Sequence, residues 1–233
     1  MGKKVNQEFT RANGTVVPMY RSKYCTSASP VWVSDDMSGK MFGIPSVSTS
    51  CLVNPFCIAR MRNGEMVCAH CFAETQQKQY SASREHSIAN YELLNGEILP
   101  LELLPRFGNV QKVRIESFGD LGGVTQAINY LNMVKVNPSV TFAWWTKNHN
   151  FVIQAIDRVF NGKKPKNLVL VASSVRLNEQ AKLPAYFDKV FTVYDKKTIA
   201  RDGIEINCGA RSCASCGRCY SKRTGSEVRE QLK

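Results

Sequence analysis

Residues 167–172 form a continuous apolar run, Asn-Leu-Val-Leu-Val-Ala, and this run restricts the folds open to the chain. A strand that is apolar on both faces is buried on both faces, which is typical of parallel sheets covered by helices. Two more strand patterns, rich in β-branched and aromatic residues, cover residues 140–146 and 189–194. We therefore expect a buried parallel sheet.

Strand-like and helix-like segments alternate around this run. Residues 112–118 alternate apolar and charged side chains before Gly119-Asp120, as a strand and its exit turn do. Two weaker strands are expected at 41–48 and 203–207. The expected helices cover residues 73–94, 126–136, 151–160 and 178–186. Five or six strand–helix repeats predict an α/β fold, as either an open doubly wound sheet or a barrel. No Gly-x-Gly-x-x-Gly follows a strand, so nothing favours a dinucleotide-binding fold.

The 233 residues are enough for one sizeable domain. Residues 1–40 are polar and read as an irregular N-terminal extension, residues 41–207 as the α/β domain, and residues 208–233 as a cysteine-rich metal-binding segment and tail. No apolar run is long enough to span a bilayer and no secretory signal is visible. We therefore expect a cytoplasmic protein with no membrane partner.

The chain is strongly basic, with 31 lysines and arginines against 19 acidic residues and a net charge of +12. This excess permits a nucleic acid or another anionic partner. The alternative is a solvated basic surface, because basic runs are short and no known nucleic-acid-reading motif is present.

Eight of the nine cysteines fall into two tight groups, and Cys25 lies outside both. The first group is Cys51, Cys57, Cys68 and Cys71, and the second is Cys208, Cys213, Cys216 and Cys219. Reducing compartments disfavour disulfides, so cysteines clustered there more often bind metal or perform redox chemistry. Both groups are therefore candidate metal sites.

The spacing within the groups favours iron–sulfur ligation. Two-residue gaps let neighbouring sulfurs turn toward one metal centre. The run Cys213, Cys216, Cys219 with a fourth cysteine nearby follows the spacing of iron–sulfur proteins, whereas zinc sites more often use two separated Cys-x-x-Cys pairs. Zinc knuckles and disulfides remain as alternatives, and His70 is a further candidate ligand.

Polar residues follow the expected strands, where functional groups gather in parallel α/β folds. These residues are Glu116, Ser117, Gly119, Asp120, Lys147, Asn148 and Ser173. The first expected strand exits into the first cysteine group, and the strand at 203–207 leads into Cys208. We therefore expect both cysteine groups at one rim of the fold. Helix caps and turns are the alternative explanation for Glu116, Asp120, Lys147 and Asn148.

These motifs resemble those of the radical S-adenosylmethionine enzymes. The likeness lies in the cysteine loop after the first strand, Phe72 beside the last cysteine, Glu116–Asp120 after the second strand, and Thr146-Lys147. It implies a partial (β/α)6 TIM-like barrel with a 4Fe–4S cluster on three of the first four cysteines and bound S-adenosyl-L-methionine. It further implies that Glu116, Ser117, Gly119, Asp120 and Ser173 hold this cofactor, and that Lys147 or Asn148 reaches cofactor or substrate.

More narrowly, the chain resembles the phage gene product 88 family. The matching stretches are residues 51–73, 114–121, 142–148 and 208–220. A phage origin would place the protein in the host cytoplasm. The chain departs from the common radical spacing, because ten residues separate Cys57 from Cys68 and Cys51 is a fourth candidate ligand.

The sequence thus predicts an iron–sulfur protein, of radical S-adenosylmethionine type if the resemblance extends to cofactor cleavage. The second cysteine group would hold an auxiliary cluster, and an external donor would supply electrons. The rival hypothesis is a non-catalytic phage protein that zinc stabilises and that binds nucleic acid. The substrate is not identified by any motif.

Overall fold

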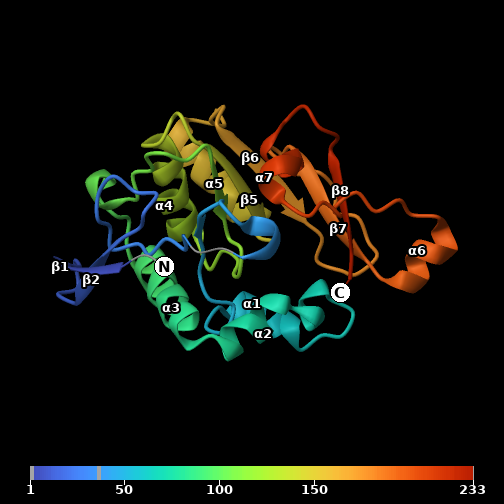
Figure 1. The fold of residues 1–233 in the computed structure, drawn as a ribbon, viewed down its shortest axis with the longest axis horizontal. Helices are drawn as coiled ribbons and strands as arrows, with labels where there is room; N and C mark the ends of the chain where they lie inside the picture. Colours follow the sequence, from blue (N-terminus) through green and yellow to red (C-terminus); the bar gives the residue numbers. More distant parts are fainter. Residues whose placement is uncertain (1–2, 36–37, 233) are drawn as a thin grey trace.

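A six-stranded parallel sheet forms the centre of the computed structural model, which describes residues 3–35 and 38–232 (Figure 1). The strands pair in chain order. They are β3 (Ser46–Val47), β4 (Lys112–Ile115), β5 (Thr141–Thr146), β6 (Leu168–Ser173), β7 (Lys189–Tyr194) and β8 (Glu227–Gln231). Parallel neighbours require a crossover between successive strands, and helices supply most of these. The expected α/β fold is confirmed, whereas β3 and β8 do not pair with each other to close a barrel.

Three helices cover what we call the outer face of the sheet. They are α3 (Ser81–Gly96), α4 (Val124–Lys135) and α5 (His149–Phe160). The apolar stripe of α5, Val152, Ala155 and Ile156, is buried in the same core as Phe142 and Trp144 of β5. Burial of these strand residues removes apolar area from water, which is the main driving force for the fold.

The opposite, inner face carries a second apolar cluster. Ala143 and Trp145 of β5 and Val169 and Val171 of β6 are buried there against Tyr220. Short helical turns cover this face: η1 (Gly39–Met41), α7 (Cys213–Cys216) and η4 (Arg218–Tyr220). Burial of both faces is why β5 and β6 are almost entirely apolar.

The remaining elements lie around the sheet. An antiparallel hairpin, β1 (Lys3–Thr10) and β2 (Val16–Arg21), lies at the left of Figure 1. Below the sheet lie α1 (Pro55–Met61), η2 (Val67–His70) and α2 (Phe72–Gln79), and η3 (Leu101–Leu103) and α6 (Lys196–Asp202) complete the fold. No helix in residues 3–35 and 38–232 is long and apolar enough to cross a membrane.

Several expected elements are wrong in detail. The irregular extension contains the β1–β2 hairpin, and the strand at 41–48 shrinks to β3 because Pro45 precedes it and Gly43 has a φ of 80°. No helix forms at 178–186, where Asn178 and Tyr186 both have positive φ. The helix at 73–94 divides into α2 and α3 at Tyr80.

The largest correction concerns the last strand. Residues 203–207 form no strand, and the sixth strand is β8, which follows the second cysteine group. Asn207 instead lies beside β8, where its side-chain oxygen accepts a hydrogen bond from the Arg229 amide at 2.9 Å. The second cysteine group therefore belongs to the connection that enters the last strand.

Candidate functional site

The first cysteine group lies where β3, β4 and β5 end, and we call its members the rim cysteines. Cys51 is in the loop after β3, and Cys57 is in α1, which begins where the Asn54 side chain accepts a hydrogen bond from the Phe56 amide. Cys68 is in η2, and Cys71 is the residue that precedes α2. All nine cysteines of the chain are free thiols.

The rim cysteines lie near one another, since Cys51 and Cys57 are buried in one apolar cluster and the partly buried Cys71 packs against it. The Cys51 thiol donates to the Gln77 side-chain oxygen at 3.5 Å, and the interaction between Cys51 and Cys71 raises the pKa of Cys51 and lowers the pKa of Cys71 to about 6. Burial raises the pKa of both Cys57 and Cys68. Cys57 also acts on Cys51, Cys68 on Cys57, and Cys71 on Cys68, so four thiols share one small region.

Lys147 supplies a positive charge to this ring. Burial alone would lower its pKa, but the nearby Cys68, Asp120 and Cys57 raise it overall. The lysine follows β5 directly, so the sheet fixes the start of its side chain. A group of thiolates is more stable beside such a cation.

Asp120 joins three segments of the rim. Its carboxylate accepts hydrogen bonds from the Thr146 hydroxyl and, at 2.9 Å, from the Lys147 amide. Its carbonyl oxygen accepts one from the Asn54 side chain at 2.8 Å. Asn148 donates to the Leu121 carbonyl at 2.7 Å. These bonds fix the ends of β4 and β5 against the cysteine loop.

Glu116 is the buried anchor of the same loop. Its carboxylate accepts hydrogen bonds from the amide and hydroxyl of Thr49 at 3.1 and 2.8 Å, from Gln126 at 2.7 Å and from Tyr130 at 2.6 Å. Burial raises its pKa to about 7. Its φ of 56° is rare for a residue other than glycine, which indicates a constrained backbone.

The other expected cofactor-binding residues are placed around this anchor. A Cβ on Gly119 would lie 2.5 Å from the Thr49 carbonyl oxygen, so that position excludes a side chain. The Ser117 hydroxyl lies 2.8 Å from that of Ser46, and its amide donates to Ser48. Ser173 is buried at the end of β6.

The second group, which we call the inner-face cysteines, surrounds α7. Ser212 caps this short helix and Gly217, with a φ of 62°, ends it. Burial raises the pKa of Cys208, Cys213 and Cys219, the last to about 12. The charge of Cys216 also raises the pKa of each of these three thiols, which indicates that all four thiols are neighbours.

Arg114 and Lys40 are the cations of the inner-face group. Burial raises the pKa of Cys213 and Cys219, and the charge of Arg114 offsets part of that rise; its guanidinium lies 3.3 Å from the ring centre of Trp145. Lys40 donates to the Cys208 carbonyl at 3.3 Å. The sequence analysis missed both residues because a single basic side chain carries no pattern.

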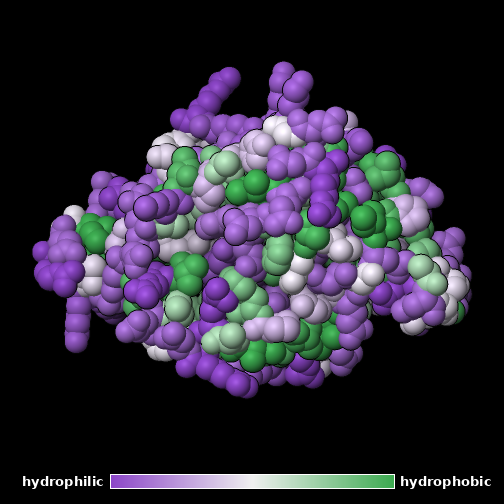
Figure 2. Space-filling model, turned by 180° about the vertical axis from the view of Figure 1, so that it is seen from behind, coloured by the Kyte–Doolittle hydropathy of each residue, from purple (hydrophilic) through white to green (hydrophobic). Residues whose placement is uncertain are grey.

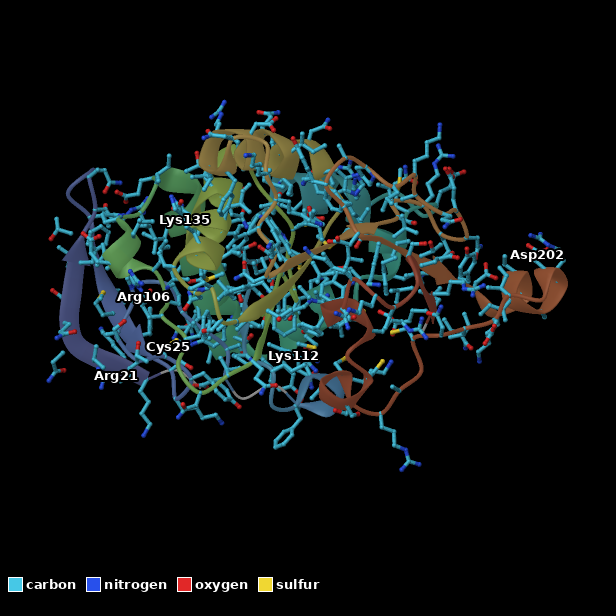
Figure 3. All side chains as sticks on the ribbon, turned by 90° about the horizontal axis from the view of Figure 1, so that it is seen from above. Arg21, Cys25, Arg106, Lys112, Lys135 and Asp202 are labelled. Carbon is cyan, nitrogen blue, oxygen red and sulfur yellow. The ribbon has the colours of Figure 1, made fainter. Side chains whose placement is uncertain are left out.

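The two groups do not share one rim, which corrects the expectation from sequence. Lys112, at the amino end of β4 and labelled in Figure 3, donates to the Ala214 carbonyl at 2.8 Å. Tyr220 packs edge-on against Trp145 with ring centres 6.3 Å apart. The inner-face cysteines thus lie over the inner face of the sheet, from Lys112 at the amino end of β4 to Arg229 of β8, whose carbonyl accepts a hydrogen bond from the Cys208 amide at 3.0 Å, whereas the rim cysteines lie at the carboxyl ends.

Other candidate residues lie apart or are exposed. His70 is exposed at the end of η2. Cys25 pairs with Phe107 in a β-bridge, and burial raises its pKa to about 12. In the described residues, no three side chains of His, Cys, Asp or Glu converge closely enough to hold a single metal ion. The donor chemistry itself, four neighbouring thiols beside a cation in each group, fits an iron–sulfur cluster.

Comparison with known proteins gives one match. The family model described as gene product 88 matches residues 9–225, which is most of the chain. The matched range includes both cysteine groups and every candidate residue named above. No curated protein and no solved structure matches the chain.

Proposed function

The chain belongs to the gene product 88 family, and we propose that it is an iron–sulfur cluster protein of the radical S-adenosylmethionine type. The observation that carries this proposal is the grouping of the rim cysteines, three of them in one apolar cluster, near Lys147 at the carboxyl ends of a parallel sheet. Functional groups of parallel α/β folds gather at that end.

Cys57, Cys68 and Cys71 are the proposed cluster ligands, with Cys51 as the fourth candidate. A bound 4Fe–4S cluster would supply the electron that cleaves the sulfonium of S-adenosyl-L-methionine. The protein's own part is to hold the thiolates and balance their charge. Lys147 balances the charge of the thiolates. Asn54 fixes the helix that carries Cys57, because its side chain hydrogen-bonds to Phe56 and Asp120.

The order of the strands supports the proposal. Six parallel strands paired in chain order, with helices on the outer face, are the arrangement expected of a partial (β/α)6 barrel. The inner face is apolar around Trp145 and Val171. A dry interior of this kind protects reactive species from water.

The cofactor would lie against the loop that follows β4. All four hydrogen bonds of the Glu116 carboxylate go to Thr49, Gln126 and Tyr130, so Glu116 would act by positioning this loop. The backbone of residues 117–120 and the hydroxyls of Ser117 and Ser173 are the proposed cofactor contacts. Lys147 or Asn148 would reach the cofactor or the substrate.

The inner-face cysteines are the proposed ligands of an auxiliary cluster. Arg114 and Lys40 would balance its charge, as Lys147 does at the rim. Because one group lies at the carboxyl ends of the strands and the other over the inner face, each cluster should assemble without the other.

Anaerobic purification followed by iron and sulfide analysis tests this proposal. We expect a brown protein with about four irons per cysteine group. Dithionite reduction with S-adenosyl-L-methionine should then release 5′-deoxyadenosine. A Cys57→Ala/Cys68→Ala variant should lose this activity and about half of the iron. Cys213→Ala/Cys216→Ala should lose the other half, and Cys25→Ala is the matched control with full iron.

Two outcomes would reject parts of the proposal. A colourless protein with stoichiometric zinc would reject the cluster and favour the metal-stabilised binding protein. A full iron complement that leaves S-adenosyl-L-methionine intact would reject the radical chemistry and keep the cluster.

A further inference from the structure

The five segments that lead into strands β4 to β8 form the end of the sheet opposite the rim cysteines, and we call it the amino-end face. The segments are residues 105–112, 135–140, 157–167, 184–189 and 221–226. Together they contain ten lysines and arginines against two aspartates. Two of them, 157–167 and 221–226, reach the top of Figure 1.

Hydrogen bonds join these segments into one surface. The Asn137 side chain accepts from the Phe107 amide at 2.8 Å and donates to the Pro105 carbonyl at 2.9 Å. Asn167 donates to the Asn137 carbonyl at 3.0 Å. Lys164 forms an ion pair with Asp188 at 2.5 Å. Each loop thus fixes its neighbour.

Six of the ten cations of the face are exposed to solvent. None of the six forms an ion pair in the described part of the chain, and they are Lys135, Arg158, Lys163, Lys166, Lys222 and Arg223. Both aspartates of the face have partners: Asp157 accepts a hydrogen bond from the Tyr186 hydroxyl at 2.9 Å, and Asp188 forms the ion pair with Lys164. In Figure 2 the side chains that stand out at the top are hydrophilic, and Figure 3, seen from above, labels Arg106 and Lys135. The positive charge is therefore available to a ligand.

The opposite end of the sheet lacks this excess. The segments that follow β3 to β7 are residues 48–71, 116–123, 147–148, 174–180 and 195–203, and they contain seven lysines and arginines against six acidic residues. Most of the net charge of the chain is thus concentrated at one end. A general need for solubility would not require that concentration.

We propose that the amino-end face binds the phosphate backbone of a nucleic acid. Regularly repeated phosphates can pair with cations spread over several loops, and the release of counterions drives such binding. Faces that bind anionic membranes add exposed apolar side chains to the cations. None of the large exposed apolar residues lies in the five segments. This inference does not depend on the proposed iron–sulfur chemistry.

The test compares two four-residue variants of the full chain by fluorescence anisotropy. The probes are a labelled DNA duplex of mixed sequence and its single strand, each titrated at several salt concentrations. The amino-end variant is Lys163→Gln/Lys166→Gln/Lys222→Gln/Arg223→Gln. The control, with the same change in net charge, is Arg62→Gln/Arg176→Gln/Lys196→Gln/Lys197→Gln, and all eight side chains are exposed.

We expect the amino-end variant to bind at least about tenfold more weakly near physiological salt. Its slope of log affinity against log salt should fall by about two units or more, since each lost phosphate contact removes about 0.9 from the slope. The control should bind as the native chain does. Equal losses in both variants, or no salt-dependent binding by the native chain, would overturn the proposal. The proposal would also be overturned if the native chain sedimented with phosphatidylserine vesicles and did not bind DNA.

Discussion

The rim cysteines and the inner-face cysteines each provide four thiols, but the surrounding structure holds the two groups in different ways. The rim loop is fixed by buried polar side chains, with Glu116 and Asp120 each accepting several hydrogen bonds. The inner-face loop contains one short helix, packs against Trp145 through Tyr220, and leaves Cys216 exposed. Donor chemistry alone therefore does not determine how firmly a thiol group is held.

The difference also extends to charge. At the rim, one lysine faces thiols and a carboxylate, since Lys147 and Asp120 both act on Cys57 and Cys68. On the inner face, Arg114 and Lys40 face the thiols with Glu230 nearby. We expect changes to the polar network to affect mainly the rim, and changes to Arg114 to affect mainly the inner face. The following predictions test this separation.

The largest effect is expected for Glu116→Ala. The change leaves the donors of Thr49, Gln126 and Tyr130 buried without an acceptor, so the free energy of unfolding should fall by about 3–5 kcal/mol. Urea unfolding measures this, and iron analysis should show loss from the rim group only. Glu65→Ala, an exposed change in the same region, should have an effect of less than about 0.5 kcal/mol. A stable Glu116→Ala protein with two intact metal groups would contradict the proposed anchor.

Glu116 also predicts a pH dependence. Its pKa is raised to about 7 in the folded chain, so between its ordinary range and pH 7 the folded state binds a proton that the unfolded state has lost. The stability that this carboxyl contributes is therefore present at low pH and is lost as pH rises toward 7. Glu116→Gln should remove that part of the slope, and an unchanged slope would show that another group is responsible.

A matched pair of cation changes should separate the two proposed metal sites. Lys147→Met and Arg114→Met each remove the charge beside one set of thiols, although Arg114→Met also removes a hydrogen bond of 3.3 Å to the Glu116 carbonyl. We expect the affinity for metal of the affected group to fall by about 10- to 100-fold. Competition with a chelator, in backgrounds that keep one cysteine group intact, measures each affinity. Equal losses from both groups in either variant would mean that the sites are coupled.

The sequence predicts the centre of the sheet better than its edges. Strands β5, β6 and β7 were correctly expected because they are buried on both faces and are therefore apolar. Strand β8 reads Glu-Val-Arg-Glu-Gln and has Val228 as its only apolar residue, so no run identifies it. The β1–β2 hairpin is mostly exposed and was missed for the same reason.

The site follows the same rule. Spacing is enough to group the cysteines, because the members of each group lie close together in sequence. The position of Cys208–Cys219 depended on which strand came last, and the short apolar pair in 203–207 was mistaken for that strand. The contacts of Glu116 with Thr49 and Tyr130 join distant segments, so no local pattern could have revealed them.

A smaller effect is expected from a methyl group at Gly119. The added Cβ would lie 2.5 Å from the Thr49 carbonyl, so the backbone before Cys51 must shift. We expect Gly119→Ala to lower the free energy of unfolding by about 1–3 kcal/mol, as overpacking does. Gly64→Ala is the matched control, because nothing lies within 4 Å of its added Cβ. Equal stability of the two variants would show that the rim loop adapts.

The smallest effect should come from the helix cap of the inner-face loop, Ser212, when it is compared with the helix cap of the rim loop, Asn54. Asn54 accepts from the Phe56 amide at 3.0 Å, donates to the Asp120 carbonyl at 2.8 Å and is fully buried. Ser212 accepts from the Ser215 amide at 3.4 Å near the surface. We expect Asn54→Ala to cost about 2 kcal/mol and Ser212→Ala about 0.5 kcal/mol of unfolding free energy. Thermal or urea unfolding of both variants measures these costs. A larger loss of stability for Ser212→Ala than for Asn54→Ala would show that the inner-face loop, and not the rim loop, depends more on its helix cap.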